Sequence, residues 1–130
     1  MSGINEIQPQ FHPFQGIPGL PFSEAVEVGN LLFLSGQIGS GADGRLVAGG
    51  IGAETRQTLA NMRSVLERHG SSLARIVKVT VMLADMSEWA AMNAEYVTFF
   101  GTNLPARSAF GCNGLAMNAR VEIECVALKN

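Results

Sequence analysis

The chain has 130 residues, of which 47% are hydrophobic and only 15% are charged, whereas an average soluble domain has roughly 25% charged residues. This length predicts one domain with a sizeable core. The net charge of -2 and the scattered basic residues argue against a protein built to bind nucleic acid. So little charged surface is typical of a subunit that associates through an apolar face, and we therefore expect an oligomer.

Motifs for cofactors, metals and export are also missing from the sequence. The glycine-rich stretch 36–52 contains neither a Walker A motif nor a dinucleotide-binding fingerprint. Cys112, Cys125 and the two histidines do not have the spacing of a zinc site. No apolar segment approaches the length of a membrane span, and no signal peptide is recognisable at the N-terminus. We expect a cytoplasmic protein without a metal or cofactor and without a membrane partner.

The first half of the chain begins with an arm and continues with a hairpin and a helix. Residues 1–20 are rich in proline and glycine, which predicts an irregular N-terminal arm before a single domain at 21–130. Residues 26–28 and 31–35 are predicted to form two strands joined by a tight turn at Gly29-Asn30. Helical spacing of apolar residues then extends over 53–69.

The second half is predicted to contain a strand, a helix and then one or two further strands. A β-branched run at 76–83 predicts a strand, and an aromatic stripe after Asp85 predicts a helix packed on the sheet. Alternating apolar residues at 121–128 predict the final strand. This order indicates an α+β domain whose helices cover one face of a mixed sheet. The opposite face would still be apolar, and the natural cover for it is another subunit.

Arg107 and Glu122 are the ionisable residues that point most directly to chemistry. Arg107 lies in the short segment Leu104–Ser108, and Glu122 lies on the last strand with Glu124. A guanidinium can bind a carboxylate with two parallel hydrogen bonds, and a nearby glutamate can orient a water molecule. The residues alone leave two other interpretations open. Arg107 could form an ordinary salt bridge, and Arg120 could form an ion-pair ladder with Glu122 and Glu124.

Several blocks of the sequence, in this order, resemble the RidA/YjgF family of small imine-hydrolysing proteins. Together they span roughly residues 20–130, and the most specific are Ser-Gly-Gln, Asn…Tyr…Phe-Phe, Pro-Ala-Arg-Ser and Glu-Ile-Glu, found at 35–37, 93–100, 105–108 and 122–124. The resemblance implies a chorismate-mutase-like α+β fold and a homotrimer with its sites between subunits. It also implies hydrolysis of enamines and 2-imino acids to 2-keto acids and ammonia.

The same resemblance assigns expected roles to individual residues. Arg107 would bind the substrate carboxylate, and Glu122 would be associated with the attacking water. Ser35 and Gly36 would line the site, and Asn93 matches an asparagine of the second helix.

Two positions depart from the family pattern. Phe22 stands where a tyrosine is usual, and Ala109 stands where a cysteine is frequent. Both changes make the expected substrate pocket more apolar.

Three alternative functions stay open at this level. The first is a non-catalytic trimer that binds a small carboxylate for regulation, which Phe22 and Ala109 favour. The second is a deaminase dedicated to one pathway enamine, of the aminoacrylate or aminomuconate type. The third is a ribonuclease, which the acidic balance and the absence of a histidine pair disfavour.

Overall fold

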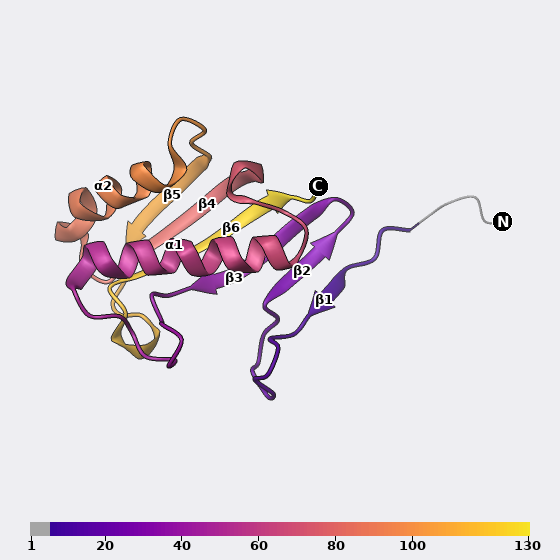
Figure 1. Ribbon diagram of the computed structural model, residues 1–130, viewed down its shortest axis with the longest axis horizontal. Coiled ribbons are helices and arrows are strands. Elements are labelled where there is room, and N and C mark those ends of the chain that lie inside the picture. The colour runs from indigo at the N-terminus through magenta and orange to yellow at the C-terminus, as the bar shows by residue number, and fades with distance from the viewer. Residues whose placement is uncertain (1–5) are drawn as a thin grey trace.

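The four predicted strands join two further strands in a six-stranded sheet, which packs with two long helices in the computed structural model of residues 6–130 (Figure 1). The strands are β1 Gln10–His12, β2 Ala25–Val28, β3 Leu31–Gln37, β4 Ile76–Leu83, β5 Ala106–Gly111 and β6 Val121–Leu128. The helices are α1 Gly50–Arg68 and α2 Trp89–Phe100, and short 3-10 turns occur at Leu73–Arg75, Met86–Glu88 and Ala116–Asn118.

The sheet is mixed and has the strand order β1-β2-β3-β6-β4-β5. β4 and β5 run parallel, and every other neighbouring pair is antiparallel. The predicted hairpin is confirmed, because Val28 pairs with Leu31 and Gly29 adopts a positive φ of 59° in the turn. The last strand of the sequence lies in the middle of the sheet, between β3 and β4.

The N-terminal arm is less irregular than its composition predicts. Gln10–His12 forms β1, which pairs with β2, and the Nε2 atom of His12 lies 3.2 Å from a carboxylate oxygen of Glu27. Three residues are too few for an alternating pattern to be visible, so only pairing with β2 reveals the strand. Residues 1–5 of the arm lie outside the described part of the chain.

Both helices pack on one face of the sheet, as the sequence predicts (Figure 1). The core between the two layers consists of inward-facing strand residues together with Leu59, Met62, Leu66, Met92 and Tyr96 of the helices. Alternation along β4 and β6 explains this core, because Val79, Val81, Ile123 and Cys125 face the helices.

No helix covers the opposite face of the sheet, which we call the open face. Large apolar side chains remain solvent-accessible there, with exposed fractions of 42% for Phe33 and 47% for Phe110. Pairing of Phe33 with Val126 and of Phe110 with Met82 shows that apolar residues continue across the strands. The predicted apolar surface opposite the helices is therefore present in the chain.

Candidate functional site

Arg107 is held on β5 by side chains of α2. Its pairing with Val79 directs the side chain toward the helix-covered face of the sheet. Nη1 of Arg107 donates a hydrogen bond to Oδ1 of Asn93 at 2.7 Å. The guanidinium carbon lies 4.7 Å from the ring centroid of Tyr96 and 5.2 Å from that of Trp89. One amide and two aromatic faces thus fix the orientation of the cation.

The guanidinium of Arg107 has no carboxylate partner within residues 6–130. A cavity of about 360 Å³ adjoins it, lined by Asn93, Tyr96, Val97, Leu104, Pro105 and Arg107. The buried hydroxyl of Tyr96 also lacks a hydrogen-bond partner in the described chain. Burial raises the pKa of Tyr96, so this hydroxyl stays protonated and can donate. The salt-bridge interpretation of Arg107 therefore finds no acidic partner among residues 6–130.

Glu122 lies on β6 and its carboxylate covers the backbone of Gly36 on β3. A β-carbon at Gly36 would lie 2.8 Å from Cδ of Glu122 and closer still to one carboxylate oxygen. Only glycine therefore leaves room for this carboxylate position. Glu122 borders a cavity of about 400 Å³, lined by Phe14, Ile17, Leu20, Phe22, Gly36, Gln37, Ile38, Ser40, Ala116, Met117 and Glu122.

Partial burial raises the pKa of Glu122 above its ordinary value of 4.5, and the negative charge of Glu124 adds to the shift. A carboxylate that serves as a base must be ionised, so if Glu122 has that role, turnover should fall as the pH decreases through a pKa above 4.5. Glu124→Gln removes the neighbouring charge and should move this acid limb to lower pH. Steady-state rates at a series of pH values measure the shift, with Glu95→Gln as the control. An acid limb that stays in place in Glu124→Gln would contradict the coupling.

The other predicted site residues join one or the other of these two groups. Phe22 lines the Glu122 cavity, 52% exposed, with its ring edge-on to Phe14 at 5.5 Å between centroids. Ser35 precedes Gly36, and its hydroxyl donates to the backbone oxygen of Ser23 at 2.5 Å. Ala109 is two residues after Arg107 on β5 and shares its face, where it packs against the core.

Arg107 and Glu122 lie on opposite faces of the same sheet. Arg107 is level with Val79 of β4 and with Cys125 of β6, both of which face the helices. Glu122 is three positions from Cys125, so its side chain points to the open face. Strand spacing puts the two backbones about 10 Å apart across β4, with a further offset of about 10 Å along the strands. One chain does not bring them to the same small molecule.

Several residues in these groups are not apparent from the sequence as site residues. Trp89 and Tyr96 belong to the aromatic stripe that predicts packing of the second helix on the sheet, whereas both rings also contact Arg107. Trp89 lies four residues before Asn93 and Tyr96 lies three residues after it, so the three side chains share one helix face. This spacing is the sequence signal that points to both aromatic residues. Ile17, Leu20 and Met117 approach Glu122 only through loop conformation, for which a single sequence carries no signal.

In the described part of the chain, Arg120 forms no ion-pair ladder with Glu122 and Glu124 along β6. Nη1 of Arg120 lies 2.8 Å from a carboxylate oxygen of Glu88, and its backbone N–H donates to Glu54 at 2.9 Å. Glu122 takes part in no ion pair among residues 6–130. The carboxylate of Glu122 is therefore left for another role.

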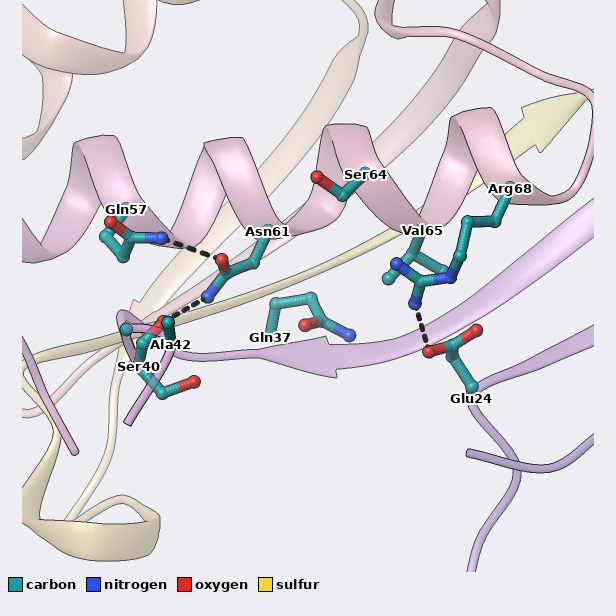
Figure 2. Close-up of a pocket in the computed structure, with 10 residues that line it drawn as sticks. Glu24, Gln37, Ser40, Ala42, Gln57, Asn61, Ser64, Val65 and Arg68 are labelled. Carbon is teal, nitrogen blue, oxygen red and sulfur yellow. Dashed lines mark hydrogen bonds and ion pairs between the residues drawn. The ribbon is translucent and has the colours of Figure 1, made fainter. Parts of the chain in front are cut away.

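A third cavity, of about 440 Å³, lies between α1 and β3 and contains none of the predicted site residues (Figure 2). The buried carboxylate of Glu24 forms an ion pair with Arg68 at one end of the cavity. Gln57 and Asn61 bind each other at the opposite end, with 2.8 Å between Nε2 and Oδ1. These groups satisfy one another, so the cavity offers no anchor comparable with the guanidinium of Arg107.

Comparison with known proteins identifies the family. The profile of the family described as endoribonuclease L-PSP matches residues 17–129. The chain belongs to this family. It is also called the RidA/YjgF family, and the match confirms the resemblance found in the sequence blocks. No helix within residues 6–130 is long and apolar enough to cross a membrane.

Relatives of known name and structure cover most of the chain. The human 2-iminobutanoate/2-iminopropanoate deaminase is 40% identical over 110 residues, which are 84% of this chain and 80% of that protein. Yeast Mmf1, whose crystal structure is known, has 33% sequence identity to this chain. The two structures align with a TM-score of 0.83 over 97% of this chain and 98% of that one. The Escherichia coli YjgF structure is 32% identical, with a TM-score of 0.79 over 92% and 94% of the two chains. The two-helix mixed-sheet fold is thus that of the RidA/YjgF family. Relatives of this chain include family members named as deaminases.

Proposed function

We propose that this protein hydrolyses reactive enamines and 2-imino acids to 2-keto acids and ammonia. The observation that carries the proposal is the guanidinium of Arg107, which borders a cavity without a carboxylate partner in the described chain and is oriented by Asn93. Such a group is suited to bind the carboxylate of a small acid through two hydrogen bonds. The deaminase names of the relatives give the reaction class.

A complete site would require a second copy of the chain. Because Arg107 and Glu122 face opposite sides of the sheet, we propose that Arg107 of one subunit meets Glu122 of another. The open face, which includes Phe33 and Phe110, supplies an apolar surface that this association would bury. A closed homotrimer is the assembly that the family resemblance implies, with sites in the clefts between subunits.

The chemistry needs a bound carboxylate, a water molecule and proton transfers. Arg107 would hold the carboxylate and so present the imine carbon in one orientation. Water, hydrogen-bonded to the Glu122 carboxylate, would add its oxygen to that carbon, while the imine nitrogen gains a proton. The resulting carbinolamine would lose ammonia as its hydroxyl becomes the keto oxygen. Glu122 would carry protons between the oxygen and the leaving nitrogen.

The alternative functions are less well supported by the site. A ribonuclease would need a basic surface and acid–base groups beside the phosphate, but His12 and His69 bind Glu27 and Glu24 away from Arg107. A regulatory trimer that only binds a carboxylate would have no use for the carboxylate of Glu122 at Gly36. A general imine deaminase and a deaminase dedicated to one pathway enamine would use this same site and would differ only in their range of substrates.

A coupled assay tests the proposal. An amino-acid deaminating enzyme generates 2-iminobutanoate in a non-nucleophilic buffer, and the rate of 2-oxobutanoate formation is followed with and without the protein. We expect acceleration by the wild-type protein. A folded, oligomeric protein that binds keto acids without accelerating the reaction would instead be a carboxylate-binding regulator.

A further inference from the structure

The N-terminal arm forms a closed loop beside Glu122. β1 fixes the start of the loop on β2, and the backbone N–H of Glu24 donates to the oxygen of His12 at 2.8 Å. The segment 13–23 between these points is therefore tied at both ends. Pro13, Pro18 and Pro21 limit the conformations open to it.

Apolar side chains of this loop face the Glu122 cavity rather than the core. Ile17 and Leu20 line the cavity with exposed fractions of 53% and 39%, and the edge-on rings of Phe14 and Phe22 extend the same wall. Glu122 is the only ionisable side chain among the cavity residues. A tied loop that keeps this much apolar surface accessible at a carboxylate is suited to an apolar ligand group.

A strained turn outside the arm brings a further apolar side chain to the cavity. Met117 and Asn118, in the loop before β6, have φ values of 58° and 59°. Left-handed backbone is costly for residues other than glycine and is concentrated at functional sites. The turn leaves the Met117 side chain 59% exposed at the cavity. A flexible thioether can adjust to apolar groups of different shape.

We infer that this cavity binds the substrate side chain and that the enzyme prefers 2-imino acids with a bulky apolar side chain. The inference rests on the proposed function and adds the substrate class. With Arg107 of the adjacent subunit on the carboxylate and Glu122 at the imine carbon, the side chain is the part left to occupy the apolar wall. One chain by itself leaves a cavity of about 400 Å³ along this wall, and the adjacent subunit shares that space with the substrate. Each further buried methylene favours binding about fourfold, so an isobutyl group, which has two more carbons than ethyl, should gain about fifteenfold.

The test compares imines of different size in the coupled assay. An amino-acid oxidase supplied with catalase generates the imines of leucine, phenylalanine and 2-aminobutyrate, and kcat/KM is measured for each. We expect kcat/KM for the leucine imine to exceed that for 2-iminobutanoate by about fifteenfold. Leu20→Ala and Ile17→Ala should lower this ratio by about threefold to tenfold. Ile7→Ala, an exposed arm residue outside the cavity, should keep the wild-type ratio.

Product binding separates failure of the inference from failure of the proposed function. Calorimetry with 4-methyl-2-oxopentanoate and 2-oxobutanoate should give the same order of affinity as the imines, with the difference reduced in Leu20→Ala. If kcat/KM for 2-iminobutanoate equals or exceeds that for the leucine imine, and the arm variants do not change this ratio, the side-chain assignment is wrong. The proposed deaminase function would then still hold. Tighter binding of the larger keto acid without hydrolysis of any imine would overturn the deaminase and keep the apolar subsite.

Discussion

Arg107→Ala is expected to lower kcat/KM for 2-iminobutanoate by about a thousandfold. In the proposed site, the change removes two charge-assisted hydrogen bonds to the substrate carboxylate, together worth about 4 kcal/mol at this half-buried position. The side chains that contact the guanidinium are uncharged, namely those of Asn93, Trp89 and Tyr96. None of them can replace the missing cation in the variant. Initial rates in the coupled assay, with circular dichroism and sedimentation to verify folding and assembly, measure the loss.

Arg63→Ala is the matched control for this variant. The Arg63 guanidinium also stacks on an α2 aromatic ring, 5.1 Å from the centroid of Phe99, and has no ion pair among residues 6–130. It is absent from the residues that line the Arg107 and Glu122 cavities, so its loss should change kcat/KM less than twofold. Retained activity in Arg107→Ala, or an equal loss in Arg63→Ala, would refute the carboxylate-anchor assignment.

Gly36→Ala is expected to reduce kcat by about a hundredfold while the fold remains intact. The new β-carbon would occupy the space of the Glu122 carboxylate, and the end of that flexible side chain can move aside at little cost in stability. Displacing a general base by even 1 Å removes most of its contribution, which is about a hundredfold or more. Steady-state kinetics and thermal unfolding of the same preparation separate the two effects.

Gly41→Ala provides the control for Gly36→Ala. Gly41 lies five residues further along, and its added β-carbon would meet no atom closer than 3.6 Å. Its activity and melting temperature should stay close to those of the wild type. If Gly36→Ala keeps full activity, the position of the Glu122 carboxylate has no catalytic importance.

Periodicity and composition predicted most of the fold. Alternation along β6, the β-branched run of β4 and the helical spacing in α1 all reflect burial of one face, which a sequence records directly. Strand β1, the placement of β5 and the central position of β6 could not be predicted in this way. All three depend on which backbone pairs with which, and side-chain patterns do not record that choice.

The candidate site could be predicted only in part. Family resemblance singled out Arg107, Glu122 and Gly36, and the structure adds that Glu122 covers Gly36 while Arg107 faces the other way. Leu20 and Met117 reach the cavity through an irregular loop and a left-handed turn. Local sequence patterns carry little information on either, so the apolar wall became visible only in three dimensions.

Activity of mixed oligomers tests the central claim, a deaminase site shared between two chains, most directly. Arg107→Ala and Glu122→Gln chains carrying different affinity tags are produced together and purified through both tags. Each variant alone should be inactive, but a mixed trimer should contain one site with both native side chains, giving about a third of wild-type activity. Mixed oligomers as inactive as either variant would contradict a site built from Arg107 of one chain and Glu122 of another.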